Sequence, residues 1–238
     1  MIEHVYGELP TTPVIFAACD SKYFMEHALP FAVSSSKAGF DTHIHVNRPD
    51  DEVLSHCDVI SANCENKVTF TFDEFSSNHL DSEEKRTFYA CLRFFVLPII
   101  LGVVKKVLTL DIDCIVMKGF EFPETNYGYF PRPNESDPGM KVAAGAVYMT
   151  NKVMGTAEEL VKVIESTPLN WFADQLALSS VFSRLPSDDV TCFDHKFMDW
   201  DFIEGTTIWT GKGMRKHVSL KYMTKKDEFK LGRTGVVV

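Results

Sequence analysis

The sequence contains no C-x-x-C motif, although it has six cysteines. Cys19, Cys91 and Cys114 lie inside apolar runs. Such positions predict buried free thiols in a reducing compartment rather than a disulfide framework. Cys57 and Cys64 leave a second interpretation open, as a metal-binding or disulfide pair.

Long hydrophobic runs are also missing. The longest, residues 94–104, contains Pro98 and Gly102 and is shorter than the roughly 18 apolar residues of a membrane helix. Residues 1–13 have no apolar core, so we expect no N-terminal signal peptide and a cytoplasmic location.

The chain lacks an overall positive charge, since its formal net charge is -9. This balance argues against nucleic acid as a partner of the whole molecule. Residues 212–238, however, hold eight Lys or Arg and two Asp or Glu. A basic tail of this kind predicts an anion site or a peripheral membrane contact, with a solvated tail as the alternative.

Neither internal repeats nor a low-complexity linker divide the 238 residues, so we expect one domain over 1–238 with a basic tail from about 212. Apolar runs predict buried strands, and helical periodicity separates them in the first half. This alternation indicates a wound α/β sheet. The expected strands are 14–19, 42–46, 68–72, 107–110, 114–117, 141–150 and 206–210, and the expected helices are 24–37, 82–101 (with Ser82 as N-cap), 156–165 and 171–182.

Asp111 and Asp113 follow the buried strand 107–110. In open α/β sheets, ligands bind beyond the carboxyl ends of the strands. Two residues apart in an extended chain, the carboxylates would share one face and offer oxygen ligands to Mg²⁺ or Mn²⁺. A surface turn with two solvated aspartates is the alternative.

Several segments resemble the family-8 glycosyltransferases, which include glycogenin and the bacterial lipopolysaccharide galactosyltransferases. The most specific is KKVLTLDIDCIV at 105–116, preceded by TFYACLRF at 87–94. In the order expected for that family, AACDSKY at 17–23 is similar to its first-strand nucleotide loop, AAGAVYMTN at 143–151 to its middle strand, WFADQ at 171–175 to its D-Q helix and WTGKGMRK at 209–216 to its phosphate loop.

The resemblance implies an α/β protein of the GT-A (nucleotide-diphospho-sugar transferase) fold, with a single Rossmann-like mixed sheet flanked by helices. It implies transfer of a hexose from a nucleotide-sugar donor, usually a UDP-sugar, with retention of configuration. The acceptor would be a carbohydrate, a lipid-linked group or a protein. Asp111 and Asp113 would hold Mn²⁺ or Mg²⁺.

The same resemblance implies roles for individual residues. Asp174 and Gln175 would lie beside the anomeric carbon as catalytic residues, although both are also suited to capping a helix. The residues implied to bind the nucleotide sugar are Ala18, Asp20, Tyr23, Arg93, Gly211, Lys212 and Lys216. The residue chemistry leaves alternatives for several of them: Tyr23 as core packing, Arg93 as the partner of a structural Asp, and Gly211, Lys212 and Lys216 as part of a solvated tail.

The sequence departs from the family pattern at two positions. Ile208 stands where the family carries a metal-binding His, which leaves His195, Asp199, His217 or water as the third ligand. Ala144 replaces an Asn that contacts the donor sugar in the family. His43 and His45 are interpreted as structural histidines on the polar face of a half-buried strand.

Other classes of function compete with this hypothesis. A D-x-D phosphohydrolase carries a similar motif near the start of its domain. A nucleotidyltransferase needs a Gly-rich loop after the first strand, and residues 18–23 have no Gly. A non-catalytic nucleotide-sugar-binding protein would keep the same binding residues.

Residues 131–138 form either a cover over a site or an inert loop, and both this loop and 199–201 are candidates for acceptor contacts.

Overall fold

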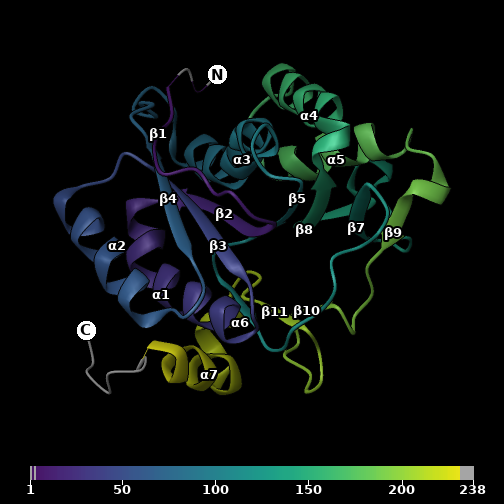
Figure 1. Cartoon of the computed structure of the whole chain (residues 1–238). Coiled ribbons are helices and arrows are strands. Elements are labelled where there is room, and N and C mark those ends of the chain that lie inside the picture. Colours follow the sequence, from purple (N-terminus) through teal and green to yellow (C-terminus); the bar gives the residue numbers. More distant parts are fainter. Residues whose placement is uncertain (1, 3, 231–238) are drawn as a thin grey trace.

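The computed structural model describes residue 2 and residues 4–230 (Figure 1). Its centre is an eight-stranded sheet in the order β1-β4-β3-β2-β5-β8-β7-β9. Strands β4, β3, β2 and β5 run parallel, whereas β8 is antiparallel to both β5 and β7. The strand bounds are β1 Tyr6–Gly7, β2 Val14–Asp20, β3 Asp41–Asn47, β4 Val68–Asp73, β5 Lys106–Leu110, β7 Tyr127–Pro131, β8 Val142–Thr150 and β9 Val190–Cys192.

Helices cover both faces of this sheet (Figure 1). One face carries α3 (Ser82–Leu101), α4 (Met154–Ser166) and α5 (Ala173–Phe182). The other carries α1 (Ser21–Lys37) and α2 (Asp51–Asn63), with α7 (Leu220–Lys230) packed against α1. The short helix α6 (Arg215–Val218) precedes α7. The predicted helix-flanked mixed sheet is therefore confirmed.

A second, three-stranded sheet was not predicted. It consists of β10 (Met198–Asp199), β11 (Ile208–Thr210) and β6 (Cys114–Val116). The predicted strand at 114–117 exists but leaves the main sheet, because the chain turns between β5 and β6. Ile115 pairs with Trp209 there. The prediction of a single sheet is wrong in this respect, and the C-terminal part of the chain thereby reaches the end of β5.

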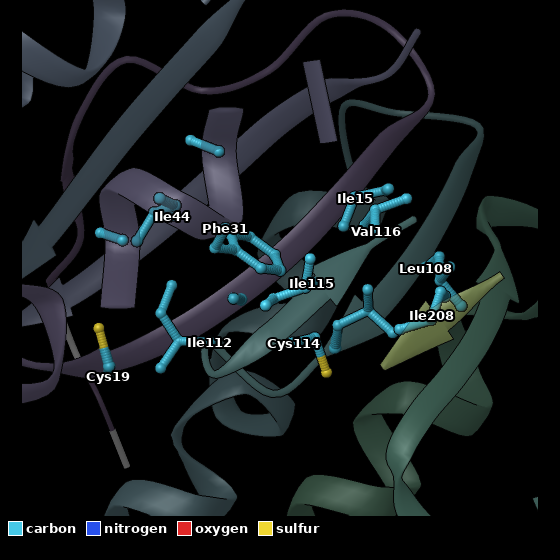
Figure 2. Packing of buried hydrophobic residues seen from close by; sticks show 14 of the residues in the cluster. Ile15, Cys19, Phe31, Ile44, Leu108, Ile112, Cys114, Ile115, Val116 and Ile208 are labelled. Atoms are coloured by element: carbon cyan, nitrogen blue, oxygen red, sulfur yellow. The ribbon is translucent and has the colours of Figure 1, made fainter. Parts of the chain in front are cut away.

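The parallel strands are buried on both faces, as their continuous apolar runs predict. Residues Val14 to Cys19 of β2 are all buried. Figure 2 shows Ile15 of β2, Ile44 of β3 and Leu108 of β5 in one cluster with Phe31 of α1. This packing fixes the carboxyl ends of β2 and β5, where the candidate site lies.

Helix α3 begins and ends at the predicted residues 82 and 101. Its N-cap, however, is Asp81 and not Ser82. The Asp81 carboxylate accepts from the amides of Glu83 and Glu84, and the Asp81 amide donates to Glu84 Oε2, which completes a capping box. Because the capping box uses Asp81 and Glu84, the helix has its N-cap at residue 81, and Ser82 is the first helical residue.

Helix α2 escaped prediction because its apolar face is narrow. Of its hydrophobic residues only Val53 and Ile60 are buried.

Cys57 and Cys64 are free thiols, like the other four cysteines, so they form no disulfide. Cys19, Cys91 and Cys114 are buried, as predicted.

His43 and His45 are more deeply buried than a half-buried strand predicts, since neither is exposed to solvent. The His43 ring contacts the hydroxyls of Thr69 and Thr71, and His45 Nε2 lies 2.6 Å from Asp73 Oδ2. Their role between β3 and β4 is structural.

No helix within residues 4–230 is long and apolar enough to cross a membrane.

Candidate active site

Asp111 and Asp113 lie in a turn between β5 and β6. The Cys114 amide donates to the Asp111 carbonyl at 3.0 Å and closes that turn. The expectation of an extended D-x-D segment is therefore wrong. Ile112 is buried in the core (Figure 2) and anchors the turn. Both aspartates remain beyond the carboxyl end of β5.

Arg93 of α3 joins Asp111 to Asp174. Its Nη1 lies 2.6 Å from Asp111 Oδ1, and its Nη2 lies 3.4 Å from Asp174 Oδ2 and 3.1 Å from the Ala144 carbonyl. Burial disfavours the guanidinium charge, but Asp111 and Asp174 raise the pKa of Arg93 above its usual value. The structure thus confirms that Arg93 pairs with aspartates, a partly exposed Asp111 and a buried Asp174, and it brings the D-x-D motif and the D-Q helix together.

Lys216 of α6 joins Asp113 to Tyr23. Its Nζ donates to Asp113 Oδ2 at 2.7 Å and to Tyr23 Oη at 3.1 Å. Lys216 and Asp113 are 9% and 8% exposed, so each ion has little water and depends on the other. Although burial opposes it, the Asp113 carboxylate raises the pKa of Lys216. Lys216 is therefore a protonated, positioned part of the site and not a solvated tail residue.

The main chain of Asp113 is attached to the C-terminal segment as well. Its carbonyl accepts from the Gly211 amide at 3.2 Å and from Tyr222 Oη at 2.6 Å. A Cβ on Gly211 would lie 3.1 Å from Asp113 Cγ and 3.0 Å from Tyr222 Oη. Glycine at 211 thus allows the close approach of this segment to the turn.

Asp174 and Gln175 are both buried in the first turn of α5, which follows Phe172 at a positive φ of 74°. Asp174 is not the N-cap, but its Oδ1 accepts from the Gln175 amide at 2.8 Å. Burial raises the pKa of Asp174, and Arg93 opposes that shift. The two side chains lie on the site side of the helix, with Asp174 held by Arg93.

Arg132 is a site residue that the sequence analysis missed. Its Nη1 donates to Gln175 Oε1 at 2.7 Å, and its Nη2 pairs with Glu135. The loop 131–138 was a candidate cover over a site. The only feature of the sequence that pointed to Arg132 was its place in this loop, directly after a strand. The structure places Arg132 against the D-Q helix.

Three predicted donor-binding residues follow the first strand. Ala18 is buried in β2. Asp20 is the N-cap of α1, and its Oδ1 accepts from the Tyr23 amide at 2.8 Å. Tyr23 is 39% exposed, so it is not a core residue. Its ring contacts the Lys216 ammonium and the His27 ring, and its exposed part is suited to stacking on a base.

Lys212 lies at the surface of the site. Its Nζ is 4.8 Å from the centre of the Trp200 ring. Within residues 4–230 it has no carboxylate within ion-pair distance. Partial burial and the charge of Arg132 lower the pKa of Lys212, so an anion bound here would stabilise its charged form.

The remainder of the basic tail is largely neutralised by neighbouring acids. Lys221, Lys225, Lys226 and Lys230 each have an acidic partner within 4 Å. A peripheral membrane contact through this tail stays a prediction, and its residues 231–238 lie outside the described residues.

The site offers few ligands for the predicted metal ion. Ile208 is fully buried in the hydrophobic cluster (Figure 2). Asp199 Oδ2 accepts from the amides of Asp201 and Ile203, and the His195 side chain is 62% exposed. Among residues 4–230, no group of three His, Cys, Asp or Glu side chains is arranged to hold a metal.

The two carboxylates of the D-x-D motif are already paired within the protein, Asp111 with Arg93 and Asp113 with Lys216. Together with the lack of a third ligand in the described part of the chain, this pairing does not fit a metal centre formed by the protein alone. The predicted Mn²⁺ or Mg²⁺ remains a prediction.

Comparisons with known proteins bear on the fold. No family model matches the sequence, and no curated protein does. The glycosyltransferase GlyE of Streptococcus pneumoniae superposes with a TM-score of 0.61 at 14% identity, over 94% of this chain and 62% of GlyE. The apo form of GlyE gives 0.59 at 13%, over 92% and 63%. The bifunctional glycosyltransferase WbbM gives 0.63 at 13%, over 95% and 51%.

The chain has the GT-A fold of glycosyltransferases. It spans between 51% and 63% of the length of these three structures. In this GT-A fold, the cluster around Arg93 and Lys216 lies beyond the carboxyl ends of β2 and β5, where open α/β sheets bind their ligands.

Proposed function

We propose that the protein is a glycosyltransferase that transfers a hexose from a nucleotide-diphosphate sugar, a UDP-sugar, with retention of configuration. The acceptor would be a carbohydrate, a lipid-linked group or a protein. The observation that carries the proposal is the convergence of Tyr23, Lys216, Asp113, Arg93 and Asp174 at one end of a GT-A sheet.

Each part of a nucleotide sugar has a chemically suitable partner in this cluster. The exposed ring of Tyr23 suits a base, and the ammonium groups of Lys216 and Lys212 suit a diphosphate. The Oε1 atom of Gln175 accepts from Arg132, which leaves the amide nitrogen of Gln175 to donate to a sugar hydroxyl. Buried donors of this kind stabilise charge that develops in a transition state.

Retention is possible without a strong nucleophile on the protein. The bond between the anomeric carbon and the diphosphate oxygen breaks, and its electron pair stays on the diphosphate. The acceptor oxygen bonds to the same face of the sugar, and its proton moves to the departing oxygen. Asp174 is engaged by Arg93 and by the Gln175 amide, so we assign it electrostatic stabilisation of the cationic sugar.

The fold weighs against the phosphohydrolase alternative, in which D-x-D follows the first strand of the domain. Here the motif follows β5, at the centre of a sheet shared with GlyE and WbbM. A non-catalytic nucleotide-sugar-binding protein has the same binding requirements, and only turnover separates it from the enzyme.

The test is a panel of UDP-, GDP- and ADP-sugars, each assayed for thermal stabilisation and nucleotide release, with excess EDTA and with Mn²⁺. We expect stabilisation and slow release of nucleotide from one donor class. Asp113→Asn should abolish both, whereas Asp188→Asn, at an exposed position, should change neither. Stabilisation without release would indicate a binding protein, and phosphate release from a simple monoester would indicate the hydrolase.

A further inference from the structure

The carboxylate of Asp113 already has a cation bound to it. Lys216 Nζ lies 2.7 Å from Asp113 Oδ2, which is the distance of a charge-assisted hydrogen bond. A divalent ion at this oxygen would have to displace a buried ammonium group. That displacement would leave Lys216, which is 9% exposed, without its counter-ion in a site of low solvent access.

The position of Lys216 is fixed by the fold and not by its side chain alone. Strand β11 pairs Thr210 with Cys114, directly after the turn. The Gly211 amide and the Tyr222 hydroxyl both donate to the Asp113 carbonyl. These contacts hold the segment before and after Lys216 against the turn, so the ammonium group is delivered to Asp113 by a rigid frame.

Lys216 keeps one donor for a ligand. An ammonium group has three N–H donors, and two of them point to Asp113 Oδ2 and Tyr23 Oη. The ammonium nitrogen also lies 4.8 Å from the centre of the Tyr23 ring, so its remaining donor is next to the ring suited to the base. This is where the phosphates of a nucleotide sugar would pass.

We propose that Lys216 takes the place of the divalent cation, so that this protein binds a nucleoside diphosphate and releases it as leaving group without a metal. This proposal rests on the proposed function. The Lys216 ammonium donates to a diphosphate oxygen and keeps its proton, while the diphosphate receives the electron pair of the broken glycosidic bond. Lys212 adds a second cation at the surface of the same site.

The experiment measures UDP binding by titration calorimetry, with GDP and ADP as further probes, in excess EDTA and in excess Mn²⁺. For the wild type we expect affinities in the two conditions to agree within about threefold, less than one charge-assisted contact contributes. Lys216→Met should weaken binding in EDTA by about tenfold or more, and Lys216→Arg should weaken it less. Lys225→Met, at a partly exposed position of α7 with Glu228 as its partner, is the matched control and should bind as the wild type does.

Metal dependence of the variant gives a second, independent readout. Once Lys216→Met has freed Asp113, Mn²⁺ should recover part of the lost affinity, an effect that a purely structural lysine would not produce. The proposal is overturned if the wild type binds UDP in Mn²⁺ only, in which case glycosyl transfer would survive as a metal-dependent activity. It is also overturned if Lys216→Met binds normally in EDTA, which would leave the proposed function in place without a role for this lysine. Absence of binding to all three nucleotides in both conditions would instead overturn the proposed function. The comparison of wild-type UDP affinity in EDTA and in Mn²⁺ tests the proposal even if the Lys216→Met variant does not fold.

Discussion

Arg132 Nη1 donates a hydrogen bond to Gln175 Oε1 over 2.7 Å and so connects the loop after β7 to the first turn of α5. The bond fixes which end of the Gln175 amide faces the site. It also assigns a positioning role to an arginine that lies 43 residues away in the sequence.

The first prediction concerns this pair. Gln175→Ala should lower turnover about a hundredfold, as expected for the loss of one donor to the transition state, with a much smaller change in donor binding. Arg132→Ala should reproduce part of the loss, and the double variant should lose less than the sum of the two in free energy. The measurement is kcat and KM for donor hydrolysis; equal losses in kcat and binding would argue for a binding role only.

The second prediction concerns Arg93. Arg93→Met should lower the free energy of unfolding by about 3–5 kcal/mol, because Asp111 and Asp174 lose their shared buried counter-ion. Arg184→Met removes an exposed ion pair with Glu159 and should cost at most about 1 kcal/mol. Urea denaturation of both variants checks this, and similar midpoints would show that the Arg93 pairs contribute no more than surface ones.

A third prediction uses two glycines. Gly211→Ala should reduce stability by about 1–3 kcal/mol and weaken nucleotide binding, because the added methyl group meets Asp113 and Tyr222 at about 3 Å. Gly155→Ala, in α4 where a Cβ has nothing within 4 Å, should stabilise the protein by about 0.5–1 kcal/mol. Thermal unfolding measures both effects, and a neutral Gly211→Ala would show that the segment 210–216 shifts freely.

Acid sensitivity is the fourth prediction. Both ring nitrogens of His27 are buried without a well-aligned hydrogen bond, although Nε2 lies 3.1 Å from Glu26 Oε1. Burial, together with the charge of Lys226, outweighs the effect of Glu26 and lowers the pKa of His27 from 6.5 to about 3. Between pH 6.5 and that lowered pKa the unfolded chain binds the extra proton, so stability must fall as the pH falls.

His27→Phe should therefore remove about 1.4 kcal/mol per pH unit from the slope of unfolding free energy against pH in this window. Urea midpoints at several pH values between 7 and 4 check the prediction. His43 stays in place in this variant, and because burial lowers its pKa to about 3, a residual slope of the same sign should remain. Identical slopes for the variant and the wild type would contradict the assignment.

Local patterns predicted most of the fold. The parallel strands are continuous apolar runs, and helix α3 has apolar periodicity between residues 82 and 101. Helix α2 was missed because its narrow buried face gives little periodic signal. Strands β9 and β10 were missed because they have three and two residues, which is too short for any alternation to be visible.

The site was predictable in its residue types but not in its pairings. The resemblance placed Asp111, Arg93, Asp174 and Lys216 near one ligand. The contacts of Arg93 with Asp111 and Asp174 depend on the packing of α3 against β5 and α5. The contact of Lys216 with Asp113 from 103 residues away depends on the second sheet. The three strands of that sheet have only two or three residues each. Segments this short show no alternation of apolar and polar residues from which a strand could be predicted.

Tyr222 reaches the Asp113 carbonyl across 109 residues. During synthesis, the residues of β2 and β5 are therefore made long before the segment that supplies Gly211, Lys216 and Tyr222. A nascent or truncated polypeptide that ends before residue 210 would contain Asp113 but lack the Lys216 ammonium and the Gly211 and Tyr222 donors that hold it. The cluster of Asp113, Gly211, Lys216 and Tyr222 is thus complete only when α6 and α7 have been synthesised.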